Sequence, residues 1–113
     1  MAAIASLLVG ATGCTASCKA YAAPSLRVQV LDTSHKPICD AVVVARDGDF
    51  SETLSAFPRD ASGRCFYSGP YERMGTYTIE ARAHGLVATA ANVKVSADQC
   101  HVITKEVVLT IGT

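Results

Sequence analysis

The stretch TYTIEARA, residues 76–83, carries the clearest structural signal in the chain. Its apolar residues Tyr77, Ile79 and Ala81 alternate with polar residues, so an extended backbone places all three on one face. A glycine directly precedes the stretch and another follows within two residues, as is typical of turns. The pattern predicts a β-strand with one face on a core and the other toward solvent.

The same period of two continues on both sides of this stretch, and no helical stripe interrupts it after residue 25. Val42, Val43 and Val44 make one segment apolar on both faces, which predicts a central strand covered on both sides. The predicted strands are residues 25–32, 39–47, 50–57, 64–69, 76–83, 87–95 and 101–111. Seven short strands with turn signals between them predict an all-β fold, an antiparallel β-sandwich.

The N-terminus reads as a targeting segment. Residues 2–12 form an apolar run well short of the roughly 20 residues that a membrane-spanning helix needs. The small residues directly before Cys14 resemble the lipobox of bacterial lipoproteins, in which the cysteine thiol receives a diacylglyceryl group. We therefore predict a lipoprotein-type signal peptide over residues 1–13 and a lipid anchor on Cys14, which would hold the protein at the membrane of the bacterial cell envelope.

Two alternatives remain for this segment. Cleavage after Ala20-Tyr21-Ala22 would release the protein without lipid, and the segment could also stay uncleaved. In the lipoprotein interpretation, residues 14–24 form a tether and residues 25–113 form one small domain.

Composition excludes several classes of partner. The formal net charge is zero and the sequence pI is about 6.8, so the composition predicts neither a basic field that binds nucleic acid nor a polybasic patch that binds anionic lipid. With Cys14 assigned to lipid, four cysteines remain: Cys18, Cys39, Cys65 and Cys100. They contain no C-x-x-C pair typical of zinc sites, so we predict no metal and no cofactor. Disulfides would suit a small domain in an oxidising compartment, and four cysteines allow three pairings.

Three segments carry a family resemblance. VQVLDTSHKPICDAVVVARDG (28–48), YERMGTYTIEARAHGL (71–86) and VKVSADQCHVITKEVVLTI (93–111) together resemble the carboxypeptidase regulatory-like domain. The matching features are a Pro-Ile-x-x-Ala start to the second strand and a Gly-x-Tyr-x-Ile strand. The resemblance implies a transthyretin-like, immunoglobulin-like Greek-key sandwich of the kind common in exported bacterial proteins.

The resemblance also implies a disulfide pattern. In transthyretin-like sandwiches the first strand lies between the fourth strand, antiparallel to it, and a late strand that runs parallel. This order would bring Cys39 near Cys65, and Cys100 near Cys18 on the approach to the first strand. The resemblance therefore implies the pairs Cys39–Cys65 and Cys18–Cys100.

A second resemblance concerns activity. VLDTSHKP, residues 30–37, is similar to the first strand of 5-hydroxyisourate hydrolase, a transthyretin-fold enzyme. That family has a catalytic histidine where this chain has Gln29, and Arg64 and His101 correspond only loosely to its other site residues. A hydrolase with a degraded active site is thus the alternative to the function we favour, a non-enzymatic envelope module.

Few other residues point to chemistry. His35, His84 and His101 lie in separate segments and are expected to be solvated polar residues, while the acidic Asp47-Gly48-Asp49 turn needs no calcium to explain it. A loop with aromatic and charged residues suits a binding surface for an unidentified protein or glycan partner. Its candidate residues are Tyr67, Tyr71, Glu72 and Arg73. Alternatively, these tyrosines cap one end of the sandwich.

Overall fold

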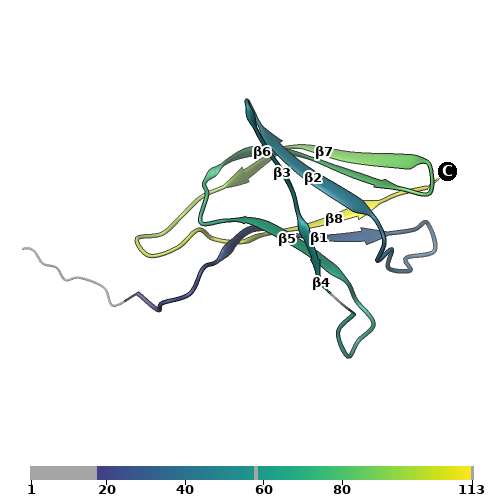
Figure 1. Cartoon of the computed structure of the whole chain (residues 1–113), viewed down its shortest axis with the longest axis horizontal. Helices are drawn as coiled ribbons and strands as arrows, with labels where there is room; N and C mark the ends of the chain where they lie inside the picture. The colour runs from purple at the N-terminus through teal and green to yellow at the C-terminus, as the bar shows by residue number, and fades with distance from the viewer. Residues whose placement is uncertain (1–17, 58, 113) are drawn as a thin grey trace, which may run out of the picture.

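A computed structural model describes residues 18–57 and 59–112, which form two four-stranded β-sheets (Figure 1). The strand order is β4–β5–β1–β8 in one sheet and β3–β2–β6–β7 in the other. The strands are β1 (Pro24–Leu31), β2 (Val42–Asp47), β3 (Phe50–Thr53), β4 (Ser55–Phe57), β5 (Phe66–Tyr71), β6 (Gly75–Ala83), β7 (Leu86–Val95) and β8 (Lys105–Thr110). The described residues contain no helix that is long and apolar enough to span a membrane.

The two sheets share one hydrophobic core, as in a β-sandwich. Val28 and Val30 of β1 and Ile79 and Ala81 of β6 are almost completely buried, and each pair alternates with more exposed residues along its strand. The predicted all-β fold and the inward face of residues 76–83 are therefore confirmed.

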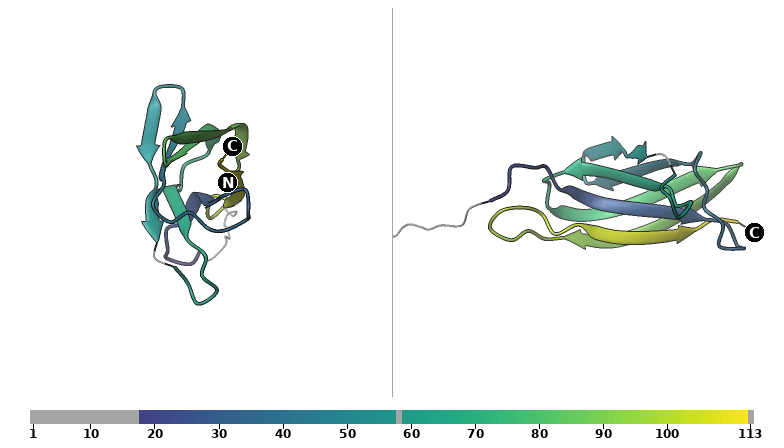
Figure 2. Two further views of the ribbon diagram at one scale, coloured as in Figure 1. Left: turned by 90° about the vertical axis from the view of Figure 1, so that its right-hand side faces the viewer. Right: turned by 90° about the horizontal axis from the view of Figure 1, so that it is seen from below.

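Strand β1 lies inside its sheet between two neighbours that are distant in sequence. It pairs antiparallel with β5, where Leu26 lies opposite Gly69, and parallel with β8, where Leu26 lies opposite Lys105. Figure 2 shows β1 and β8 running side by side. These are the neighbours that the transthyretin-like order implies, and the parallel pair makes the sheet mixed rather than purely antiparallel.

The predicted strand 50–57 is divided between the two sheets. Its first part, β3, pairs with β2, whereas its last part, β4, pairs with β5 in the opposite sheet. Leu54 lies between them, with its side chain buried and its N–H donating to the carbonyl of Val43. The structure thus has eight strands in the described residues instead of seven, because the chain passes from one sheet to the other at Leu54.

Strand β2 lies within its sheet between β3 and β6, but only one of its faces is covered. Val43 is fully buried, whereas Val42 is 52% exposed. The prediction of a strand covered on both sides was wrong. Successive side chains of a strand point to opposite faces, and only the inner face of this sheet meets the core.

Both predicted disulfides are present. Cys39–Cys65, with Cα atoms 5.6 Å apart, joins the segment before β2 to the segment before β5. Cys18–Cys100, with Cα atoms 5.4 Å apart, joins the chain before β1 to the loop before β8. The predicted signal peptide and Cys14 lie outside the described residues.

The sandwich has two distinct ends (Figure 1). The tether end consists of residues 18–23, the β5–β6 connection 72–74 and the β7–β8 loop 96–104. The far end consists of residues 32–40, 59–65 and 83–86. Residues 18–23 and the loop 96–104 lie together, while residues 32–40 lie at the opposite end.

Candidate functional site

The structure separates the four residues predicted to form a binding surface. Tyr67 lies in the core with 1% of its surface exposed, facing inward from β5. Its hydroxyl donates to the carbonyl of Ile38 at 2.7 Å and accepts from the N–H of Ala41 at 3.0 Å, and burial raises the pKa of its phenol. Its assignment to an exposed binding surface was therefore wrong, whereas Tyr71 is 43% exposed and accessible.

Glu72, directly after β5, joins three segments of the chain. Its carboxylate accepts hydrogen bonds from the N–H of Ala23 at 2.9 Å and from the N–H of Val102 at 3.0 Å. It also pairs with Nδ1 of His101 at 2.5 Å. The bonds from Ala23, then those from Val102 and His101, hold the pKa of this carboxyl below its usual value.

His101 contacts the tether with both its ring and its second nitrogen. Nε2 lies 3.0 Å from the carbonyl oxygen of Lys19, and the ring stacks on Tyr21 with centroids 4.3 Å apart. A protonated imidazole donates from both nitrogens, one to Glu72 and one to Lys19, and the bond to Glu72 is the main cause of its raised pKa. We call this group, Lys19, Tyr21, Glu72 and His101, the tether clamp.

Arg73 is held by a separate set of contacts, with the neighbouring β2–β3 hairpin and with β6. Its guanidinium lies 3.8 Å from the ring centroid of Phe50 and donates to Asp47 and to the hydroxyl of Tyr77, each at 3.1 Å. The bond to Tyr77 and the pair with Asp47 raise the pKa of Arg73. Asp47, one of the acidic residues in the turn considered for calcium, is thus paired with Arg73.

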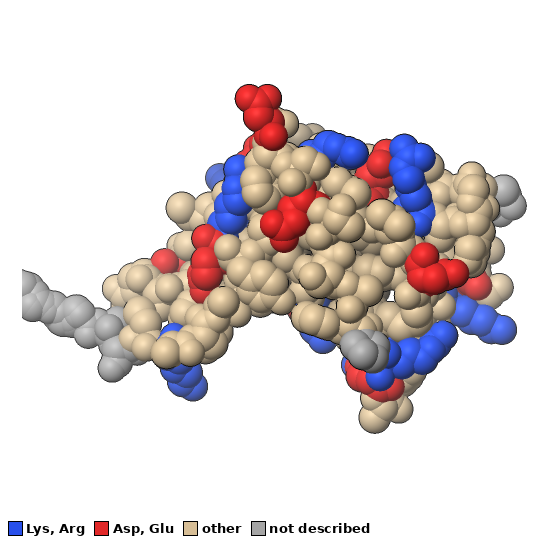
Figure 3. All heavy atoms as spheres, viewed as in Figure 1, with Lys and Arg blue, Asp and Glu red and all other residues tan. Residues whose placement is uncertain are grey.

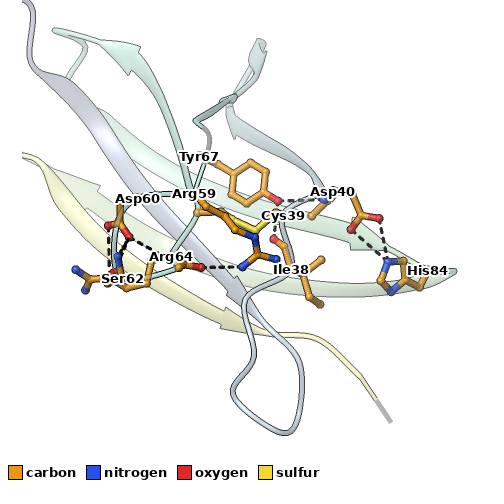
Figure 4. Close-up of a disulfide and its surroundings, with 12 residues drawn as sticks. Ile38, Cys39, Asp40, Arg59, Asp60, Ser62, Arg64, Tyr67 and His84 are labelled. Carbon is orange, nitrogen blue, oxygen red and sulfur yellow. Dashed lines mark hydrogen bonds and ion pairs between the residues drawn. A yellow bond between two sulfur atoms is a disulfide. The ribbon is translucent and has the colours of Figure 1, made fainter.

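The described residues contain no group of three or more His, Cys, Asp or Glu side chains placed to hold a metal ion. At the far end, however, an open hollow of about 440 Å³ lies beside the Cys39–Cys65 disulfide (Figure 4). It is lined by Asp32, Lys36, Pro37, Ile38, Cys39, Asp40, Arg59 and His84.

The hollow carries charges of both signs and an exposed histidine–carboxylate pair. Nε2 of His84 lies 3.2 Å from each carboxylate oxygen of Asp40, and Arg59 donates to the carbonyl of Gly63. The one cysteine in the lining is in a disulfide. The charged side chains around it can donate and accept hydrogen bonds, as the binding of a polar ligand requires.

The residues considered for hydrolase chemistry are not brought together. Arg64 lies just before β5 begins, whereas His101 contacts Glu72, just after β5 ends. The six residues of β5 separate them by roughly 20 Å. Gln29 lies partway along β1, so the geometry gives the hydrolase alternative no support.

The tether clamp predicts a pH dependence of stability. Since the pKa of Glu72 is lowered from 4.5, its contribution is present above pH 4.5 and is lost as the pH falls through the lowered pKa. Since the pKa of His101 is raised from 6.5, its contribution is present below pH 6.5 and is lost as the pH rises through the raised pKa. We expect urea unfolding to show the greatest stability between these two values.

The His101→Gln variant should lose most of the decline in stability that the wild-type protein shows as the pH rises above 6.5. His84→Gln is the matched control, because this histidine lies exposed at the far end and pairs only with Asp40. The control should keep the decline. An unchanged decline in His101→Gln would contradict the role assigned to this pair.

Sequence reasoning missed the clamp because Glu72 and His101 are 29 positions apart and no motif links them. It treated His101 as a solvated residue, although its side chain is only 15% exposed. Comparisons of this chain with models of protein families, with curated proteins and with solved structures found no match.

Proposed function

We propose that this chain is an exported, lipid-anchored, non-enzymatic β-sandwich module of the bacterial cell envelope, with a structural or binding role. Its finer architecture would be a Greek-key, transthyretin-like sandwich of the carboxypeptidase regulatory-like type. The position of β1, between an antiparallel β5 and a parallel β8, supports this assignment. So does the alternation of buried and exposed residues in the Gly-x-Tyr-x-Ile strand β6.

The two disulfides are consistent with an exported protein, since structural disulfides persist in oxidising compartments. The apolar run 2–12 and the small residues before Cys14 supply the sequence signals for export and lipidation.

The observation that carries the proposal is the attachment of the tether to the sandwich. Cys18, four positions after Cys14, is bonded to Cys100, and Tyr21 stacks on His101. Cleavage after Ala22 would remove Cys18 and Tyr21 and leave Cys100 without its partner. The contacts of Cys18 and Tyr21 with the sandwich therefore favour processing before Cys14 over processing after Ala22.

An anchor at the tether end leaves the far end directed away from the membrane. The hollow there, with Asp32, Lys36, Asp40, Arg59 and His84 in its wall, is the surface we propose for a polar partner, a protein or a glycan. Its mixed charges provide both hydrogen-bond donors and acceptors.

Phase partition in a detergent tests the anchor. We expect the wild-type protein in the detergent phase and Cys14→Ser in the aqueous phase, because the substitution removes the thiol that carries the lipid. Thr15→Ser, the neighbouring substitution that keeps the thiol, should remain in the detergent phase. A wild-type protein that is wholly aqueous, with a mature N-terminus at Ala23, would refute the proposal.

A further inference from the structure

We infer that the tether end of the sandwich contacts the lipid bilayer directly, so that the folded domain is not separated from the membrane by a flexible linker. The inference rests on the proposed lipid anchor at Cys14. It adds a second contact with lipid, made by side chains of the folded domain.

Exposed apolar side chains gather at this end. Among the described residues eight large hydrophobic side chains are exposed, and four of them lie in the tether end or, for Tyr71 at the end of β5, directly before its segment 72–74. They are Tyr21 (57% exposed), Tyr71 (43%), Met74 (60%) and Ile103 (56%). Tyrosine suits the boundary between headgroups and acyl chains, with its ring in the apolar layer and its hydroxyl in water, and Met74 and Ile103 add fully apolar surface.

Three lysines in or beside this end can contact lipid phosphates. Lys94 at the end of β7 and Lys105 at the start of β8 line a small hollow of about 110 Å³ together with Ile103, and Lys19 follows Cys18 in the tether. None of these lysines forms an ion pair in the described part of the chain.

Three acids lie in or beside this region. Glu72 is paired with His101 and Asp47 with Arg73, while the carboxylate of Asp98 accepts hydrogen bonds from the N–H groups of Cys100 and His101. None of these acids pairs with the three lysines in the described residues, so the lysines can meet lipid phosphates. On the face drawn in Figure 3, acidic and basic side chains are interspersed over the sandwich, while the tether end shows mostly uncharged surface.

The short chain between Cys14 and Cys18 determines how far the tether end can lie from an anchored lipid. Three residues separate Cys14 from Cys18, and an extended chain advances at most about 3.6 Å per residue, so the two cysteines lie within about 14 Å of each other. The disulfide and the tether clamp hold residues 18–23 against the domain, so these residues add no length to the connection between Cys14 and the sandwich. A lipid on Cys14 therefore brings the exposed side chains of the tether end to the headgroup layer.

Fluorescence quenching by brominated lipid tests this orientation, because the chain contains no tryptophan. Ile103→Trp is placed in the full, lipidated protein, in vesicles of phosphatidylethanolamine and phosphatidylglycerol that contain brominated phosphatidylcholine. We expect about twofold quenching, since interfacial side chains reach roughly 5–10 Å into the headgroup and acyl boundary. Val87→Trp is the matched control, because Val87 is 48% exposed and lies near the far end, and it should stay unquenched.

Several outcomes would overturn the inference. Equal quenching of the two variants, or none in Ile103→Trp while mass spectrometry shows lipid on Cys14, would refute the orientation and leave the proposed function intact. A tryptophan at position 103 that is shielded from acrylamide but not quenched by lipid would show that a protein covers this end.

An unmodified Cys14 would instead refute the anchor. Quenching of Ile103→Trp by added vesicles would then still support lipid binding by the tether end. An absence of quenching would refute lipid binding by this end. Met74→Trp provides a second probe if Ile103→Trp fails to fold, with the same expected result.

Discussion

Replacing Cys18 and Cys100 together by alanine should lower the free energy of unfolding by about 4.5 kcal/mol. The disulfide spans a sequence separation of 82, and the chain-entropy estimate of its contribution grows with the logarithm of the closed loop. A typical small domain has a total stability of only about 5–15 kcal/mol, so this loss would leave the sandwich marginal. Urea unfolding in a Cys14→Ser background measures the effect, because that background leaves no free thiol to mispair.

The same variant should release the tether from the clamp. The stacking of Tyr21 on His101 and the bond from Ala23 to Glu72 remain possible, but the disulfide no longer holds residues 18–23 near the loop before β8. We expect proteases to cut the tether faster than in the parent protein. A change in unfolding free energy below about 0.5 kcal/mol, the range of neutral surface substitutions, would contradict the structural role of this disulfide.

Replacing Cys39 and Cys65 by alanine should cost about 3.5 kcal/mol, less than the first pair because the sequence separation is 26. This disulfide connects the entry to β2 in one sheet with the entry to β5 in the other, and Cys65 is buried. It therefore ties the two sheets together at the far end. Urea unfolding in the Cys14→Ser background measures the loss, with Cys18→Ala/Cys100→Ala as the comparison.

Tyr67 supports the same connection from inside the core, since its hydroxyl bonds to Ile38 and to Ala41 on either side of Cys39. Tyr67→Phe should therefore have a smaller effect once the disulfide is gone, because the two changes loosen one segment. Strict additivity in a double-mutant cycle would show that the disulfide and the hydroxyl act independently. A loss for the Cys39–Cys65 pair larger than that for the Cys18–Cys100 pair would contradict the loop-length argument.

Much of the fold followed from local patterns. The alternation in residues 25–32 and 76–83 predicted β1 and β6, because a strand with one buried face must place apolar residues at every second position. The family resemblance added what alternation could not provide, namely the neighbours of β1 and the two cysteine pairs.

The alternation of apolar and polar residues is a poor guide in β5, where side chains on both faces are buried for different reasons. Phe66 and Tyr67 are both buried, but Tyr67 belongs to the core, whereas Phe66 lies under the guanidinium of Arg27, 3.7 Å from its ring centroid. The residues around Leu54 likewise include no glycine or proline that would mark the passage from β3 in one sheet to β4 in the other.

The tether clamp was beyond sequence reasoning for another reason. Glu72 acts through hydrogen bonds from the backbone of Ala23 and Val102, and every residue except proline carries such an N–H group. No residue type therefore marks these partners. Only the fold, which brings the end of β5 beside the tether and the β7–β8 loop, places them around one carboxylate.

The parallel pairing of β1 with β8 also determines when the protein can fold. Leu26 and Lys105 lie side by side although 78 residues separate them, so one edge of β1 stays unpaired until β8 is available. A chain that is delivered from its N-terminus can pair β2, β3, β6 and β7 early, but the sheet around β1 closes last. Closure of such a long loop is slow, because the chain must lose conformational entropy before the contacts between the two strands can form. The sheet around β1 thus stays incomplete until β8 is available, a delay that would suit the proposed export, in which a chain passes through a membrane before it folds.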